Sequence, residues 1–164
     1  MKRLLICRHA KSSWKDPELR DFDRPLNKRG QRDAPEMGRR LAAHGLRPDL
    51  ICSSPALRAM STAQLYAGQV GYPLAQIRYD PLQYAATVPV LVRLLQEIDK
   101  RVQTLMLVGH NPESTALANL LGGLTIDNIP TAGIVALEFA LDHWQGVHPG
   151  TGALLFFDYP KKQE

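Results

Sequence analysis

Short apolar segments alternate with segments of helical periodicity along this chain, and this alternation constrains its fold more than any other feature. Hydrophobic residues recur three and four positions apart in four segments, as at Ala34, Met37 and Leu41. Strands separated by helices predict βαβ units, and therefore a mostly parallel sheet covered by helices on both faces. The expected strands are residues 3–8, 49–52, 76–79 and 104–109.

Two adjacent strands near 134–140 and 153–159, joined by a loop rich in Gly, Pro and His, predict a closing C-terminal hairpin. A chain of 164 residues, 45% hydrophobic and 22% charged, fits one compact, soluble domain. We therefore expect an α/β fold, a single three-layer domain over residues 1–164. Pro35 is the awkward position, because it would lie inside a helix capped by Asn27. Either that helix starts near Asp33 or it is kinked.

The N-terminal segment begins like a secretory signal, but Arg8 and His9 end its apolar run far too early. No other apolar run approaches the length that spans a bilayer. We therefore expect a cytoplasmic protein with no membrane partner. The two cysteines, Cys7 and Cys52, provide no disulfide framework and are expected to be buried and reduced.

Basic residues are concentrated in the N-terminal fifth, where residues 1–32 hold ten Lys/Arg and four Asp/Glu. Such a patch can bind nucleic acid, membrane phosphates or a phosphorylated partner, or it can be a solvated surface. Nucleic-acid binding favours aromatic residues between the basic ones, and this region offers only Trp14 and Phe22. No nucleic-acid partner is expected.

Polar residues follow three of the predicted strands, at the edge where a parallel sheet places its ligand site. Arg8 and His9 end the first strand, Arg58 follows the second, and His110 follows the fourth. Ser54 is expected to be the N-cap of the helix that carries Arg58. The sequence thus predicts two arginines and two histidines on one rim, beside helix N-termini that favour anions.

This set of side chains suits phosphoryl transfer to a nitrogen nucleophile. Two guanidinium groups can bind the phosphoryl oxygens in bidentate fashion and offset their charge in the transition state. One imidazole, kept neutral by the nearby cations, can attack phosphorus. The other can donate a hydrogen bond to the same oxygens.

The chain resembles the histidine phosphatase superfamily, and in particular its short SixA-like phosphohistidine phosphatase branch. The resemblance rests on residues 4–14 (LLICRHAKSSW), 21–30 (DFDRPLNKRG), 49–63 (DLICSSPALRAMSTA) and 107–112 (LVGHNP). It implies a phosphoglycerate mutase-like fold and a phosphohistidine enzyme intermediate formed without cofactor or metal.

By the same resemblance, the catalytic residues are His9 as the nucleophile, Arg8 and Arg58 as the phosphate-binding arginines, and His110 as the second histidine. The same two arginines bind the substrate, and the further candidates for substrate binding are Arg24, Ser12 and Asn111.

Departures from the family pattern bear on the substrate. Ala10 replaces the glycine that follows Arg-His, which the turn tolerates if its φ is negative, and Lys15 stands where phosphoglycerate mutase-like members have asparagine. Tyr84 occupies the place of the glutamate that protonates the leaving group, unless Asp80 takes that role. A phosphoramidate nitrogen can be protonated before cleavage, so the missing acid favours an N-phosphoryl substrate. The stretch between Arg58 and Tyr84 is too short to hold a lid, and an open site suits phosphohistidine on a folded protein.

Alternative interpretations remain open on sequence grounds: a phosphatase of a small phosphorylated metabolite, or a phosphate-recognising module without turnover. Cys52 and Arg58 also have the Cys-x5-Arg spacing of cysteine-based phosphatases, but Pro55 removes a backbone donor from that loop. The other three histidines lack ligand spacing, so no metal site is expected. They are His44, His143 and His148.

Overall fold

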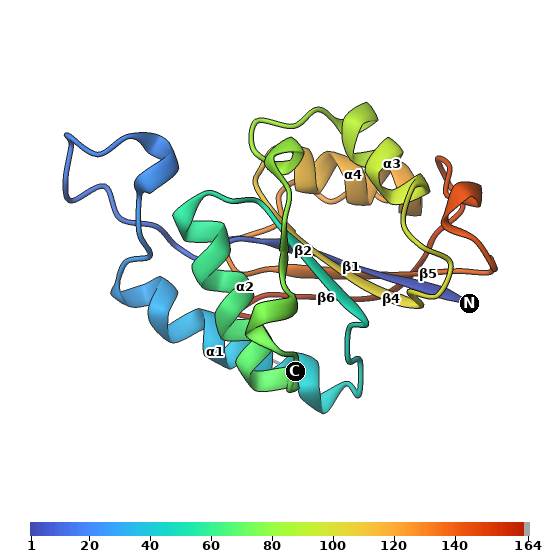
Figure 1. The fold of residues 1–164 in the computed structure, drawn as a ribbon, viewed down its shortest axis with the longest axis horizontal. Helices are drawn as coiled ribbons and strands as arrows, with labels where there is room; N and C mark the ends of the chain where they lie inside the picture. Colours follow the sequence, from blue (N-terminus) through green and yellow to red (C-terminus); the bar gives the residue numbers. More distant parts are fainter. Residues whose placement is uncertain (163–164) are drawn as a thin grey trace.

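The computed structural model describes residues 1–162 and has a central six-stranded sheet with helices on both faces (Figure 1). The strands are β1 (Lys2–Arg8), β2 (Leu50–Ser53), β3 (Arg78–Tyr79), β4 (Thr104–Gly109), β5 (Ile134–Phe139) and β6 (Ala153–Asp158). The α-helices are α1 (Lys28–Ala43), α2 (Leu57–Val70), α3 (Val88–Gln96) and α4 (Glu113–Gly122). Four short 3-10 turns are η1 (Asp21–Asp23), η2 (Leu74–Gln76), η3 (Pro81–Gln83) and η4 (Trp144–Gly146).

The strand order is β3-β2-β4-β1-β5-β6. β1, β2, β3 and β4 run parallel, whereas β5 is antiparallel to β1 and β6 is antiparallel to β5. The prediction of a mostly parallel sheet with a closing C-terminal hairpin is therefore confirmed. Because the parallel strands end at the same edge, the residues that follow β1, β2 and β4 share that edge.

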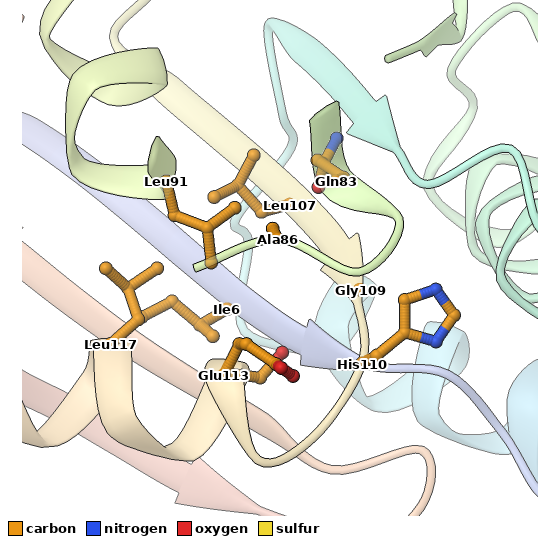
Figure 2. Close-up of a pocket in the computed structure, with 10 residues that line it drawn as sticks. Ile6, Gln83, Ala86, Leu91, Leu107, Gly109, His110, Glu113 and Leu117 are labelled. Atoms are coloured by element: carbon orange, nitrogen blue, oxygen red, sulfur yellow. The ribbon is translucent and has the colours of Figure 1, made fainter. Parts of the chain in front are cut away.

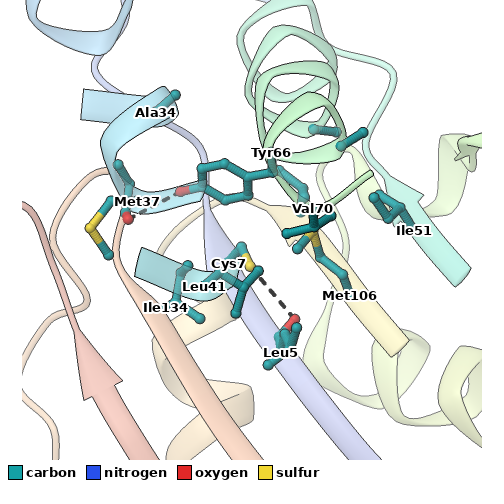
Figure 3. Close-up of a cluster of buried hydrophobic side chains, with 14 of the residues drawn as sticks. Leu5, Cys7, Ala34, Met37, Leu41, Ile51, Tyr66, Val70, Met106 and Ile134 are labelled. Carbon is teal, nitrogen blue, oxygen red and sulfur yellow. Dashed lines mark hydrogen bonds between the residues drawn. The ribbon is translucent and has the colours of Figure 1, made fainter. Parts of the chain in front are cut away.

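Each face of the sheet has its own hydrophobic layer. β1 alternates its side chains, so Leu5 and Cys7 contact the layer under α1 and α2, while Leu4 and Ile6 contact the layer under α3 and α4. Figure 3 shows the first layer, in which the buried Tyr66 also donates a hydrogen bond to a backbone carbonyl. The three-layer architecture expected from the sequence is confirmed.

One expected strand boundary was wrong, and one of the two alternatives for the helix around Pro35 is excluded. β3 is only two residues long and pairs with the last two residues of β2, because residues 74–76 form a 3-10 turn instead of extended chain. The helix carrying Pro35 does not start near Asp33: α1 begins at Lys28, where Asn27 Oδ1 accepts the N–H of Gly30 at 2.9 Å. Pro35 lies inside α1, and the cap together with the buried face of the helix outweighs its missing donor.

Within residues 1–162, no helix is both long and apolar enough to cross a membrane.

Candidate active site

His9 lies at the end of β1 and is held there by its backbone. Its N–H donates to Gly109 O at 3.0 Å, and its carbonyl accepts from the N–H of Ala132 at 3.0 Å. The ring is buried, and Nδ1 lies 2.7 Å from the carbonyl oxygen of Ala10. Because a carbonyl oxygen only accepts, Nδ1 carries the ring proton. In the neutral ring, the lone pair is therefore on Nε2.

His110 faces His9 from the loop between β4 and α4, and the two ring centroids are 5.2 Å apart. His110 Nε2 is 2.8 Å from Ser54 Oγ, which also accepts the N–H of Ala56 at 3.2 Å. Ser54 is thus not the N-cap of α2, because that helix begins at Leu57. Its hydroxyl instead orients His110, a role that the cap interpretation concealed.

Both imidazoles are held neutral. Burial, reinforced by His110 and the charges of Arg58 and Arg8, lowers the pKa of His9 from 6.5 to about 3. Burial and the charge of Arg58 lower the pKa of His110 to about 4. At neutral pH, therefore, each ring has one nitrogen with a proton and one with a lone pair.

Two guanidinium groups flank the imidazoles. Arg8 donates from Nη1 to Ile129 O at 2.8 Å, while its Nε is buried without a hydrogen-bond partner among residues 1–162. His110 Nδ1 is also buried without a hydrogen-bond partner among these residues. Arg58, in the first turn of α2, is buried and donates from Nη2 to Asp21 Oδ2 at 2.9 Å. Buried polar atoms without partners are rare in folded proteins, and here they lie in one cluster.

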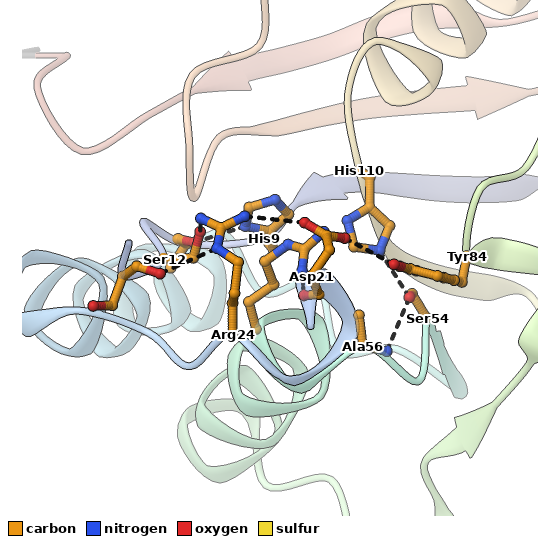
Figure 4. A network of polar contacts seen from close by, with 11 residues as sticks. His9, Ser12, Asp21, Arg24, Ser54, Ala56, Tyr84 and His110 are labelled. Atoms are coloured by element: carbon orange, nitrogen blue, oxygen red, sulfur yellow. Dashed lines mark hydrogen bonds and ion pairs between the residues drawn. The ribbon is translucent and has the colours of Figure 1, made fainter. Parts of the chain in front are cut away.

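The Asp21 carboxylate, in η1, links several of these groups (Figure 4). Its Oδ2 accepts from Tyr84 Oη at 2.8 Å as well as from Arg58, and its Oδ1 accepts from Arg24 Nη1 at 3.2 Å. Partial desolvation alone raises the pKa of Asp21, but the hydrogen bonds from Tyr84 and Arg58 and the charge of Arg58 lower it to about 2. The carboxylate is therefore ionised at neutral pH.

Arg24 and Ser12, both candidates from the sequence, support this arrangement from the loop between β1 and α1. Arg24 is buried and donates from Nη2 to Ser12 Oγ at 2.6 Å and from Nε to Ser13 O at 3.1 Å. The exposed ring of Trp14 stacks on its guanidinium, 3.2 Å from Cζ to the ring centroid. With its third contact to Asp21, Arg24 positions the carboxylate.

Asn111 has its side chain committed within the loops around α4. Its Oδ1 accepts from the N–H and the hydroxyl of Thr115, and its Nδ2 donates to Asn128 Oδ1 and Ile129 O. The helix that follows, α4, begins at Glu113.

The other positions raised by departures from the family pattern lie at the margins of the site. Asp80 accepts the N–H of Leu82 as the cap of η3, and Lys15 is exposed. Among residues 1–162, the non-glycine residues with positive φ are Ala85 and Ala132, so Ala10 satisfies the turn's requirement.

The cysteine-based alternative is not supported by the geometry. Cys52 is buried, and desolvation raises the pKa of its thiol. Its Sγ accepts from Gln83 Nε2 at 3.1 Å. A protonated thiol buried in the layer under α3 and α4 is a packing residue, not a nucleophile.

An apolar pocket lies behind His110, between the sheet and the helices α3 and α4 (Figure 2). Ile6, Leu91, Leu107 and Leu117 line it, and the ring of His110 extends away from them. The pocket backs the site and offers no cationic group. In the part of the chain that the structure describes, no three His, Cys, Asp or Glu side chains are grouped to hold a metal ion.

Comparison with known proteins identifies the family. Residues 4–81 match the family described as the histidine phosphatase superfamily (branch 1). A crystal structure from Agrobacterium tumefaciens assigned to the phosphohistidine phosphatase SixA is 31% identical, with a TM-score of 0.81 over 97% of this chain and 98% of that one. The chain belongs to the histidine phosphatase superfamily. It is SixA-like in fold and sequence, and it is a phosphatase of the hydrolase class.

Two proteins are similar to this histidine phosphatase in sequence, and a second solved structure shares its fold. An uncharacterized Mycobacterium tuberculosis protein is 34% identical over 164 residues, covering 94% of this chain and 99% of the relative. An uncharacterized chloroplastic protein of Arabidopsis thaliana is 35% identical, covering 88% of this chain and 69% of the relative. The fold also matches that of the protein histidine phosphatase SixA complexed with tungstate, with a TM-score of 0.83 at 20% identity over 96% and 97% of the two chains.

Proposed function

We propose that this protein hydrolyses phosphohistidine on proteins through a phosphohistidine intermediate on His9, without metal or cofactor. The observation that carries the proposal is the His9 ring, whose proton is held on Nδ1 by Ala10 and whose pKa is lowered to about 3. Such a ring presents a lone pair on Nε2 at neutral pH, as a nucleophile for phosphorus requires.

The arginines and His110 supply the charge that phosphoryl transfer needs. Arg8 Nε and His110 Nδ1 are buried donor positions without partners in residues 1–162, and phosphoryl oxygens would satisfy both. If the Ser54 hydroxyl donates to His110 Nε2, the ring proton lies on Nδ1 and faces the phosphoryl group. Arg58 adds the positive charge of a second guanidinium from α2, whose Nη1 and Nη2 also donate to the carbonyl and the carboxylate of Asp21.

A nitrogen leaving group fits the surroundings better than an alkoxide. Tyr84, in the glutamate's place, donates its proton to Asp21, and that hydrogen bond raises the pKa of the phenol. Asp21 itself stays ionised. Neither group readily donates a proton to a leaving alkoxide. The leaving ring of a protonated phosphohistidine already carries a proton.

The access to the site favours a macromolecular substrate. The chain between Arg58 and Tyr84 consists of the rest of α2 followed by η2, β3 and η3. These elements build the domain itself and leave no inserted segment to close over the arginines. A histidine on the surface of a folded protein can therefore approach the rim.

The test is turnover of a phosphohistidine protein, a phosphohistidine peptide and an aryl phosphate, all in EDTA. We expect the phosphohistidine substrates to be preferred and phosphate on His9 to be acid-labile and alkali-stable. His9→Ala should lose roughly three orders of magnitude in turnover, because the covalent route is gone. Cys52→Ser is the matched control and should keep most activity. An active His9→Ala enzyme, or activity that EDTA abolishes, would overturn the proposal.

A further inference from the structure

The Asp21 carboxylate is the one acidic group in direct contact with the arginine cluster among the described residues. It accepts hydrogen bonds from Arg58, Arg24 and the hydroxyl of Tyr84, and Figure 4 shows it between Arg24 and Tyr84. Its side chain is 50% exposed, whereas those of Arg24 and Arg58 are 7% and 8% exposed. The carboxylate therefore lies on the solvent side of Arg24 and Arg58, the side from which a substrate reaches these arginines.

Asp21 retains capacity for one more hydrogen-bond donor. A carboxylate offers about four acceptor positions, two on each oxygen. Oδ2 uses both, for Arg58 and Tyr84, while Oδ1 accepts only from Arg24 within residues 1–162. An ionised, half-exposed acceptor beside an anion site attracts a cationic donor and repels a second anion.

The charges of the site leave Asp21 available for the leaving group. Arg8, Arg24 and Arg58 carry three positive charges, Asp21 carries one negative charge, and the two histidines are neutral. The balance of two positive charges matches a phosphoryl dianion. A phosphohistidine protonated on its free ring nitrogen adds one positive charge next to phosphorus, whereas a monoester leaving group gains negative charge as its bond breaks.

We propose that Asp21 is a specificity-determining residue that selects a phosphoryl group attached to a protonated imidazole over phosphate monoesters, by accepting the imidazolium N–H at Oδ1. This inference rests on the proposed function and deepens it, because it identifies the group that recognises the leaving ring.

The chemical step balances with this assignment. The lone pair on His9 Nε2 forms a bond to phosphorus while the substrate's P–N bond breaks. The bonding pair returns to the substrate ring, which keeps its proton and leaves as neutral imidazole. Water then attacks the phosphorus of phospho-His9, the P–Nε2 bond breaks and its pair returns to His9, and both protons of the water leave with dihydrogen phosphate. Because the leaving ring keeps its N–H from the bound ground state through the transition state, the Asp21 contact stabilises both states about equally and acts mainly on KM and kcat/KM.

The experiment compares wild type, Asp21→Asn and Asp23→Asn on phosphoimidazole, a phosphohistidine peptide and an aryl phosphate. Asp23 is the control, since it lies in the same turn but pairs with the exposed Arg20. We expect Asp21→Asn to raise KM about ten-fold for the N-phosphoryl substrates, the effect of losing one charge-assisted bond. Their kcat should change little, and KM for the aryl phosphate should stay the same or fall. Asp23→Asn should behave as wild type.

A second measurement uses wild type alone. Added KCl should weaken the preference for N-phosphoryl substrates, because it screens a half-exposed carboxylate, while competition by chloride at the arginines affects all substrates alike. If Asp21→Asn impairs the three substrates equally, Asp21 only supports Arg58 and the inference fails while the proposed function stands. If wild type hydrolyses the aryl phosphate but neither N-phosphoryl substrate, the proposed function itself fails.

Discussion

Burial, more than any specific partner, keeps the rings of His9 and His110 neutral. Desolvation is the largest cause of the lowered pKa of each ring, and the arginine charges add to it. The same burial lowers the free energy of unfolding at low pH, because the unfolded chain binds protons that the two buried rings do not.

The free energy of unfolding should therefore fall as the pH drops from about 6.5 toward 4. The unfolded histidines protonate near pH 6.5, whereas His110 and His9 in the folded protein do so only near 4 and 3. In this window the unfolded state binds more protons, so stability rises with pH. Urea unfolding in phosphate-free buffer at several pH values measures the slope. His110→Gln should make the slope shallower, and an identical slope in the variant would contradict the assignment.

Some residues of the candidate site were predicted from the sequence, and others were not. Arg8, His9, Arg58 and His110 follow strands whose ends must converge in a parallel sheet, so topology alone brought them together. Asp21 lies in an aperiodic loop, and only its position three residues before Arg24 signalled an ion pair. Its contacts to α2 and to Tyr84 depend on how that loop folds back, which no local pattern encodes.

At the scale of elements, the first turn of α1 is fitted against the chain that follows His9. Asn27 N–H donates to Lys11 O at 3.0 Å, and a Cβ on Gly30 would lie 2.2 Å from the same oxygen. A glycine is required here by close backbone approach. The start of α1 and the loop that follows His9 thus share one contact.

Gly30→Ala should destabilise the protein by about 1–3 kcal/mol, the usual cost of overpacking, and should lower activity by displacing the loop after His9. Gly68→Ala is the matched control: that glycine lies within α2, and a Cβ added to it would have no neighbour within 4 Å, so alanine there should stabilise by about 0.5–1 kcal/mol. Chemical denaturation and turnover of both variants measure the difference. If the two variants are equally stable, the loop around Lys11 moves aside at no cost and the prediction is wrong.

Helices and strands with a long periodic pattern were predictable from the sequence. Boundaries that depend on tertiary contacts were less so. The parallel core and the C-terminal hairpin followed from the alternation of strands and helices. β3 was expected two residues too long, because the chain before it turns as η2 and does not extend along β2. Pro35 suggested either a helix start near Asp33 or a kink; α1 starts earlier, at Lys28, because Asn27 caps the helix and Met37 and Leu41 anchor its buried face.

For the molecule as a whole, an oxyanion should act as a stabilising ligand. Orthovanadate at about 100 times its dissociation constant should add about 2.7 kcal/mol to the free energy of unfolding by mass action. For a chain of this size, that is a rise in Tm of roughly 5–10 °C. Arg58→Ala should abolish most of the rise, as measured by thermal unfolding. A full rise in that variant would place the anion elsewhere.

β1 lies between β4 and β5, and this position has a consequence for biosynthesis. Arg3 pairs with Thr104, and Lys2 pairs with Phe139. At about 5–20 residues per second, the ribosome makes β1 on the order of 5–20 s before β4. During that interval its apolar segment has no partner strand, so the nascent chain exposes a site for chaperones. Arg8 and His9 are thus synthesised long before the strands that hold them.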